Sequence, residues 1–480
     1  ATLLTRCEAW ATTTSQGAGT CDNNVANGSA EAHNDLMTTR MPHFPDGFAW
    51  GTATSSYQIE GSPDADGKGM SIWDTFAHTP GKIANGETGD VACDHYRRWP
   101  EDLDLLPQVG CNAYRFSLSW PRILPEGTGR VEPRGLDFYD RLVDGLLARG
   151  IAAFPTLYHW DLPQALQDAG GWYERSTAEA FAEYAQVVAK RIGDRASAFI
   201  TLNEPGIHTS LGHVLGVHAP GLTDLERAYW VIHHQLVGHG LAVRAIHDTA
   251  NKPAGLTNNL SPILAADTLS RDDILAADRM DLLFNRQYLD PVLLGRNPAD
   301  IEEIYGPTAL EVVRDGDLEI IGTHMDFLGV NYYNPQWVKA AAPDNPLGFD
   351  LADPPADLPR SAFGWPVVPA SFTDLLLRLR ADYTRALPPI YVLENGTSWP
   401  DVHDRFRIDY LDAHVRAVAD AMAEGVDIRG YFCWSLMDNF EWAEGMSQRF
   451  GLVHVDFATQ QRTIRDSGRW FAELTAGRLG

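Results

Sequence analysis

Two glutamates, each at the end of an apolar run, have the residue type and setting for acid–base or nucleophilic chemistry. An apolar run over 390–393 leads into Glu394, and a second run over 198–203 leads into Glu204. Runs that are apolar on both faces are typical of buried parallel strands, and the Asn-Gly and Pro that follow are strand-ending signals. Two carboxylates at strand ends suit glycoside hydrolysis, in which one protonates the leaving oxygen and the other attacks the anomeric carbon or activates water.

Polar and aromatic residues also lie within or just after the ends of the predicted strands. They include Gln58, Arg115, His159, Trp160, Asn203, Asn331, Tyr333, Trp434, Glu441 and Trp442. Sugars need this mixture, because their hydroxyls take hydrogen bonds while the C–H face of the ring stacks on an aromatic plane. A single buried tryptophan usually fills core, and a single glutamate is usually solvated or ion-paired. Their clustering beside two carboxylates therefore predicts a sugar site. Arg115 is either a structural ion-pair partner or the cation that keeps Glu394 ionised, and the two interpretations are compatible.

The elements that must position these residues alternate eight times along the chain. Strands are predicted at 48–55, 112–119, 151–158, 197–203, 254–260, 326–332, 389–394 and 429–435. Amphipathic helices are predicted at 136–149, 177–192, 224–248, 272–289 and 408–424, with a capping box at Ser176 and Glu179. Eight strand–helix alternations predict the α/β class and a single (β/α)8 TIM barrel. The long insertions at 57–92 and 334–370 follow strands, so they are expected to build the active face.

Composition narrows the classes of partner. The 480 residues are 44% hydrophobic and 21% charged, and no apolar run reaches the length of a membrane span. The formal net charge of −26 disfavours nucleic acid and anionic lipid as partners. We therefore expect a soluble protein with a neutral small-molecule substrate, and the oligomeric state stays open.

The cysteines, histidines and N-terminus predict a cytoplasmic enzyme without a metal or cofactor. The five cysteines form no metal-type pair and are interpreted as reduced thiols. Neither set of closely spaced histidines, 208–218 and 233–239, has metal-ligand spacing. Residues 1–41 lack the pattern of a signal peptide and are predicted to be an extension or leader with no catalytic role, which leaves 42–480 as the catalytic domain.

Over about residues 42 to 475 the sequence resembles the family 1 glycoside hydrolases, the β-glucosidase family. The resemblance is carried by Phe44-Pro45-Asp46-Gly47-Phe48-Ala49-Trp50-Gly51, Ser56-Tyr57-Gln58-Ile59-Glu60-Gly61, Tyr114-Arg115-Phe116-Ser117, Thr201-Leu202-Asn203-Glu204-Pro205 and Glu394-Asn395-Gly396. Leu393 stands where the family usually has threonine. The family fold is the barrel already predicted from the alternation of elements.

The resemblance implies a role for each site residue. Glu204 would be the general acid/base and Glu394 the nucleophile, with Arg115 and Tyr333 holding Glu394. The remaining residues would bind substrate, with Trp434 as the stacking floor: Gln58, His159, Trp160, Asn203, Asn331, Trp434, Glu441, Trp442 and Phe450.

The implied activity is that of a retaining exo-β-glucosidase with some β-galactosidase or β-fucosidase activity. Two alternatives are a 6-phospho-β-glycosidase and a catalytically silent sugar-binding barrel. Glu441 disfavours the first, because its negative charge would repel a 6-phosphate. The presence of both Glu204 and Glu394 disfavours the second.

Overall fold

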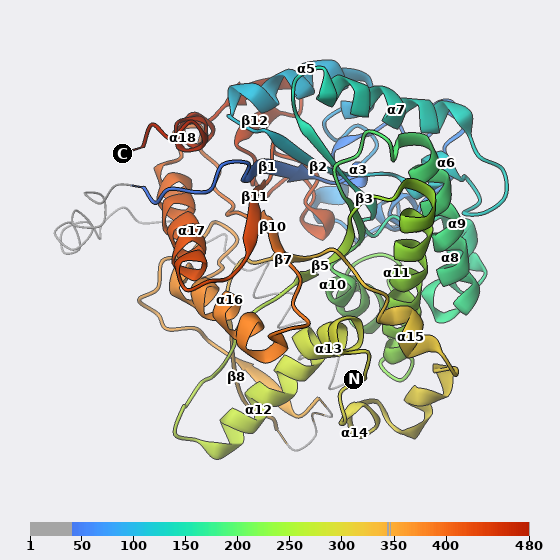
Figure 1. Ribbon diagram of the computed structural model, residues 1–480, viewed down its shortest axis with the longest axis vertical. Coiled ribbons are helices and arrows are strands. Elements are labelled where there is room, and N and C mark those ends of the chain that lie inside the picture. The colour runs from blue at the N-terminus through green and yellow to red at the C-terminus, as the bar shows by residue number, and fades with distance from the viewer. Residues whose placement is uncertain (1–40, 343–344, 346, 480) are drawn as a thin grey trace.

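The computed structural model describes residues 41–342, 345 and 347–479, and its centre is a closed barrel of eight parallel strands (Figure 1). In order around the barrel the strands are β1, β11, β10, β7, β5, β4, β3 and β2. Their bounds are Ala49–Thr54, Ile428–Trp434, Ile390–Asn395, Phe327–Asn331, Ala254–Asn259, Phe199–Asn203, Ala152–Tyr158 and Ala113–Ser117, respectively. Each lies within or overlaps a predicted strand, and the predicted (β/α)8 barrel is confirmed.

The strands are buried on both faces, as their apolar runs predicted. Every residue of β2 and of β4 is buried. Alternate side chains point into the barrel, where a compact apolar cluster is formed by Ala113, Phe154, Ala198, Ile200, Phe327, Leu393 and Phe432. Arg115 lies two residues after Ala113 on the same face of β2. The apolar filling therefore gives way to charged residues toward the carboxyl ends of the strands, where barrel enzymes carry their active sites.

Helices surround the barrel (Figure 1). The longer ones are α5 (His95–Gln108), α7 (Pro133–Leu147), α9 (Arg175–Ile192), α11 (Ala228–Ala250), α12 (Arg271–Asp281), α13 (Gln287–Leu294), α16 (Pro369–Tyr383), α17 (Arg405–Ala423) and α18 (Asp466–Thr475). The single helix predicted at 272–289 is divided, because a π-helical turn at Leu282–Arg286 separates α12 from α13. Within the described residues, no helix is long and apolar enough to cross a membrane.

The predicted capping box at Ser176 is wrong. Helix α9 begins at Arg175, and its N-cap residue Glu174 accepts no hydrogen bond through its side chain. A 3-10 turn, η4 (Gly171–Tyr173), leads directly into the helix, and the Thr177 hydroxyl donates back to the Gly171 carbonyl at 2.6 Å. Ser176 is therefore already inside the first turn, where it cannot act as a cap.

The longest insertions follow strands, as predicted. The connection after β1 contains the short helices α3 (Ser56–Ile59) and α4 (Ile72–Ala77). The connection after β7 contains β8 (Gln336–Ala340) and β9 (Phe349–Ala352), and β8 pairs with both β9 and β6 (Ile263–Ala265) in a separate small sheet. After β11 comes a hairpin of β12 (Val453–Asp456) and β13 (Gln461–Ile464).

Candidate active site

Arg115 is the central cation of the site and links four strands. Its Nη1 donates to Glu394 Oε1 at 2.6 Å, and its Nη2 donates to Asn203 Oδ1 at 2.5 Å. Its Nε donates to Thr156 Oγ1 at 3.1 Å. The arginine side chain is 1% exposed, so this ion pair is screened very little by water. The geometry is compatible with both interpretations of Arg115, because the same guanidinium ties strands together and places a positive charge beside Glu394.

Glu394 is turned into the barrel by an irregularity of its strand. Leu393 packs in the apolar cluster inside the barrel, so strict alternation would point Glu394 outward. The pairing register of β10 shifts after Val392 against both neighbouring strands. Such irregularities re-aim side chains next to active sites. Glu394 Oε1 then accepts a hydrogen bond from Arg115. Glu394 Oε2 accepts one from the Tyr333 hydroxyl at 2.7 Å.

Glu204 directly follows β4 and adopts a left-handed backbone conformation, with φ 46°. A non-glycine residue in this region costs on the order of 1 kcal/mol and persists only where its surroundings fix it. Its Oε1 accepts hydrogen bonds from Asn331 Nδ2 at 2.7 Å and from Asn259 Nδ2 at 3.4 Å. The sequence reasoning missed Asn259, although its place at the end of strand β5 was the available signal.

The two carboxyl groups have different electrostatic surroundings. Burial, followed by the charge of Glu394, raises the pKa of Glu204 to about 8. Burial also raises the pKa of Glu394, but the Arg115 charge and the Tyr333 hydrogen bond oppose that rise. Burial and Glu394 raise the pKa of Tyr333 well above its usual range, so Tyr333 remains a donor. The pair can therefore hold one proton on Glu204 while Glu394 is the anion.

His159 offers a free N–H group toward the same space. Its Nε2 lies 3.0 Å from Asn203 Nδ2, and because the amide can only donate, Nε2 is the acceptor. Burial and the nearby Arg115 charge lower the pKa of His159 well below its usual range. The imidazole is therefore neutral and carries its proton on Nδ1, a buried atom with no partner in the described part of the chain. A substrate hydroxyl is a suitable acceptor for that proton.

Gln58 is held by residues from two loops. The Ser55 hydroxyl donates to its Oε1 at 2.6 Å. Its Nε2 donates to Asn439 Oδ1 at 3.1 Å and to the Phe440 carbonyl at 2.9 Å. The amide is thus oriented on both sides before substrate arrives, which reduces the entropy lost on binding.

Glu441 is poised for a ligand. Its Oε2 is buried and has no partner among the described residues, which is rare for a buried carboxyl oxygen. Burial first, and then the charge of Glu394, raises the pKa of Glu441 to about 8. The raised pKa favours the protonated form, in which this carboxyl can donate as well as accept.

Aromatic rings enclose the polar groups. Trp434 and Trp442 each stack near His159, with ring centroids 5.9 and 5.8 Å away, and Trp160 lies 4.7 Å from Trp442. Phe450 is 2% exposed and packs in a cluster with Trp434. The remaining members of that cluster are Ala53, Phe363, Tyr333 and Trp365. The structure thus brings together all thirteen predicted site residues; Thr156, Asn259, Phe363, Trp365 and Asn439 were not foreseen.

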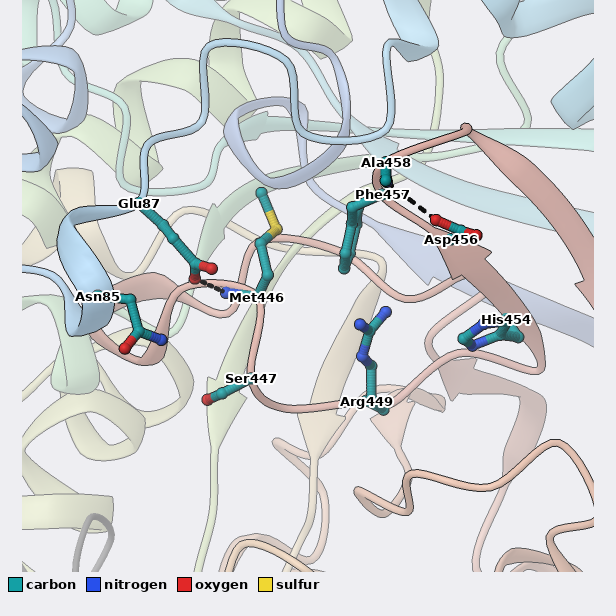
Figure 2. A pocket seen from close by; sticks show the side chains of 9 residues that line it. All are labelled: Asn85, Glu87, Met446, Ser447, Arg449, His454, Asp456, Phe457 and Ala458. Carbon is teal, nitrogen blue, oxygen red and sulfur yellow. Dashed lines mark hydrogen bonds between the residues drawn. The ribbon is translucent and has the colours of Figure 1, made fainter.

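A separate cavity of about 410 Å³ lies along the loop that follows Glu441 (Figure 2). It contains no predicted site residue. Its lining includes Glu87, whose Oε2 accepts the Met446 backbone N–H at 2.6 Å, and Arg449, whose guanidinium lies 4.5 Å from the centre of the Phe457 ring. Elsewhere in the described ranges, no group of three or more His, Cys, Asp or Glu residues is placed to hold a metal ion.

A buried carboxyl pair at the carboxyl ends of a parallel barrel, surrounded by amides and indoles, defines the class of barrel glycosidases. The model of glycosyl hydrolase family 1 matches residues 40–478, and the chain belongs to that family.

Its relatives have consistent names. "Beta-glucosidase A" of Thermotoga maritima is 47% identical over 441 residues, which are 90% of this chain and 97% of that protein. The "Bifunctional beta-D-glucosidase/beta-D-fucosidase" of Bifidobacterium breve is 44% identical over 459 residues, covering 90% and 98%. The solved structure of the T. maritima family 1 β-glucosidase superposes with a TM-score of 0.87 at 46% identity, covering 91% of this chain and 99% of that one.

Proposed function

We propose that this protein is a retaining exo-β-glucosidase, which removes terminal β-D-glucosyl residues from β-glucosides and short oligosaccharides such as cellobiose. The observation that carries the proposal is the asymmetry of the buried pair: a cation and a phenol contact Glu394, whereas neutral amides contact Glu204. The names of the relatives support the substrate class, and the bifunctional relative supports an additional β-fucosidase activity. A structure of the T. maritima enzyme with a cyclophellitol-type transition-state mimic supports the glycosidase chemistry.

The geometry supports a two-step mechanism. Glu394, ionised beside Arg115, attacks the anomeric carbon, while Glu204 gives its proton to the leaving oxygen. The glycosylated Glu394 is neutral, so the charge that raised the pKa of Glu204 is gone. Glu204 then accepts a proton from water, which attacks the anomeric carbon and regenerates Glu394. Two inversions at one carbon give net retention.

The groups around the pair suit a single sugar ring. Asn203 is positioned by Arg115 and His159, so its amide can meet a hydroxyl close to the reacting carbon. Gln58, His159 and Glu441 supply oriented polar groups farther away, and Trp434 supplies the stacking plane. A site closed by these residues accepts only the non-reducing terminal unit, which makes the enzyme exo-acting.

The phosphorylated alternative is disfavoured by the charges around Glu441. The groups whose charges raise the pKa of this residue are Glu394, Glu444 and Glu204, and all three are acidic. A phosphate dianion placed there would meet carboxyl groups instead of cations. The repulsion comes mainly from these neighbours and less from Glu441, whose raised pKa favours its neutral form. The silent barrel is disfavoured by the intact, oriented pair of carboxyl groups.

We further propose that the enzyme works in the cytoplasm without a metal or cofactor, on a small glycoside substrate and without nucleic acid or membrane partners. The three cysteines in the described residues, Cys93, Cys111 and Cys433, are free and buried, which supports a reducing compartment. Burial raises the pKa of each thiol, so none is a ready metal ligand or nucleophile.

Azide tests the two roles separately. With an aryl β-glucoside that has an activated leaving group, Glu204→Ala should still form the glycosyl enzyme, and azide should then give the β-glucosyl azide. Glu394→Ala has no nucleophile, so azide should attack from the opposite face and give the α-glucosyl azide. Proton NMR of the products identifies the anomer. The same anomer from both variants would contradict the assignment, and Glu444→Ala, which changes a carboxyl outside the pair, is the control that should give neither azide.

A further inference from the structure

A chain of hydrogen bonds connects the ends of the first three barrel strands beneath the sugar site. The Ser117 hydroxyl, at the end of β2, donates to the Ser56 hydroxyl at 3.2 Å, and the Ser56 hydroxyl donates to Asp161 Oδ2 at 2.7 Å. The Ser56 backbone N–H also donates to Ser117 Oγ at 2.7 Å. Because Asp161 Oδ2 is the final acceptor of this chain, it sets the direction of both hydroxyl groups.

Ser56 and Asp161 belong to segments that carry different sugar-binding residues. Ser56 is the first residue of α3, the four-residue helix that also contains Gln58. Asp161 directly follows His159 and Trp160 in the loop after β3. One buried hydrogen bond therefore joins the segment that presents Gln58 to the segment that presents His159.

The loop that Asp161 anchors is strained. Trp160 has φ 76°, a left-handed conformation that a bulky residue rarely adopts. Such strain persists only where the surroundings fix it. Trp160 Nε1 donates to the Asn203 carbonyl at 2.8 Å on one side, and the bond from Ser56 to Asp161 holds the next residue on the other.

Burying the Asp161 side chain at this position costs free energy. It is 1% exposed and its Oδ1 has no partner among the described residues. Burial raises the pKa of Asp161 to about 7, the charge of Glu60 adds to this rise, and the Ser56 hydrogen bond and Lys68 oppose it. A buried carboxyl with one unpartnered oxygen does little for stability, so a role in the site explains its presence better.

We propose that Asp161, through its hydrogen bond with Ser56, is a positioning residue that sets the spacing between Gln58 and His159 around the sugar. It touches no reacting atom and acts through the two loops. This inference rests on the proposed β-glucosidase function. It adds a residue that fixes the segment carrying Gln58 relative to the segment carrying His159.

The test compares Ser56→Ala and Asp161→Ala with the wild type on an aryl β-glucoside and on its 3-deoxy, 4-deoxy and 6-deoxy analogues. Gln58→Ala first identifies the sugar hydroxyl that Gln58 binds. In the wild type, removing that hydroxyl lowers kcat/KM, and in Gln58→Ala this loss should disappear. We expect Ser56→Ala and Asp161→Ala to raise KM for the glucoside about tenfold with a smaller change in kcat, and to reduce the same deoxy penalty severalfold. Asp161→Asn keeps an acceptor oxygen for the Ser56 hydroxyl, so its KM should lie close to the wild-type value.

The control is Ser119→Ala, since Ser119 lines the same small internal cavity as Asp161 and is not bonded to Asp161 in the described structure. If Ser56→Ala and Asp161→Ala lowered activity on the parent and on all deoxy substrates in parallel, or left KM unchanged, the positioning role would be overturned. Calorimetric binding of a glucose-shaped iminosugar gives a second readout and should weaken about tenfold in Ser56→Ala. A wild type without activity on any aryl β-glucoside would instead refute the proposed function, while the calorimetry would still test Asp161.

Discussion

At the scale of single residues, chemistry in this site is set by what surrounds two identical side chains. Glu204 and Glu394 are both buried, yet one meets amides and the other meets a guanidinium and a phenol. The asymmetry makes the pKa of Glu204 depend on the charge of Glu394. That dependence is what allows one carboxyl to act first as an acid and later as a base.

The coupling predicts a pKa that changes during turnover. In the free enzyme Glu204 should titrate near pH 8, so kcat/KM should fall as the pH rises through this value and Glu204 loses its proton. Trapping Glu394 as a 2-deoxy-2-fluoroglucosyl ester removes its charge and should lower the pKa of Glu204 by roughly 1–3 units. Carbon-13 NMR of labelled glutamate in the two forms measures this shift. An unchanged pKa on trapping would show that Glu394 does not control Glu204.

Glu441 should control both affinity and the choice of glycone. Glu441→Ser removes a buried carboxyl with a free oxygen, so kcat/KM for an aryl β-glucoside should fall on the order of a hundredfold. The ratio of 6-phosphoglucoside to glucoside activity should rise, because one of the converging acidic groups is gone. Glu424→Ser, at the exposed C-cap of α17, is the control and should leave the ratio unchanged. An unchanged ratio in Glu441→Ser would place Glu441 outside the glycone site.

At the scale of elements, close approaches between strand ends decide where the residues point. Gly396 follows Glu394 and Asn395, and a Cβ atom built there would lie 1.9 Å from the Trp434 carbonyl oxygen. The Asn-Gly pair was interpreted as a turn signal, but Asn395 is the last residue of β10. Its side chain donates to the Tyr332 carbonyl at 2.7 Å and accepts from the Tyr431 hydroxyl at 2.6 Å. The glycine is thus needed for packing against β11.

Gly396→Ala should therefore damage the site as well as the fold. Overpacking of this kind costs about 1–3 kcal/mol of unfolding free energy. Because the displaced atoms belong to the backbone of Trp434, kcat/KM for an aryl β-glucoside should fall at least tenfold. The control is Gly238→Ala in α11, because a Cβ atom built at Gly238 would lie no closer than 3.3 Å to any neighbouring atom. Urea unfolding measures the loss of stability in both variants, and steady-state kinetics measures the loss of kcat/KM. Equal losses in Gly396→Ala and Gly238→Ala would show that Gly396 is not needed for the close approach to β11.

At the scale of the whole molecule, one closed barrel carries the entire site. The residues that contact Glu204 and Glu394 come from strands or strand ends spread from β2 to β10 around the circle. Family similarity also extends from residue 40 to 478, which is nearly the whole described chain. The expectation that 1–41 lacks a catalytic role falls almost entirely on residues outside the described part.

A chain that begins at Met41 should keep the function. The Met41 backbone N–H donates to the Leu479 carbonyl at 3.3 Å, so this residue already contacts the other end of the domain. The shortened enzyme should have kcat/KM within about twofold of the full chain and a similar Tm, because no assigned residue is removed. Kinetics and thermal unfolding of the two chains check this. A large loss in either quantity would show that the removed segment contributes to the barrel or to the site.

Much of this protein could be predicted from its sequence by itself. The eight apolar runs and the helices between them predicted the barrel, because hydrophobic period and length are local properties of a chain. The polar residues just after each run predicted the site, since the carboxyl ends of parallel strands meet on one face. Glu204 and Glu394 were singled out in this way, and Arg115 was singled out within the second predicted strand.

Only the tertiary structure decided how those residues act on one another. The register shift that turns Glu394 inward, the left-handed backbone at Glu204 and the amide of Asn259 depend on neighbours from other strands. The raised pKa of Glu441 also has this origin, because burial and the charges of Glu394 and Glu204, which are distant in the chain, contribute to it. Local pattern determines which segments form strands and helices, whereas the aim and charge of a side chain depend on atoms that only folding brings near.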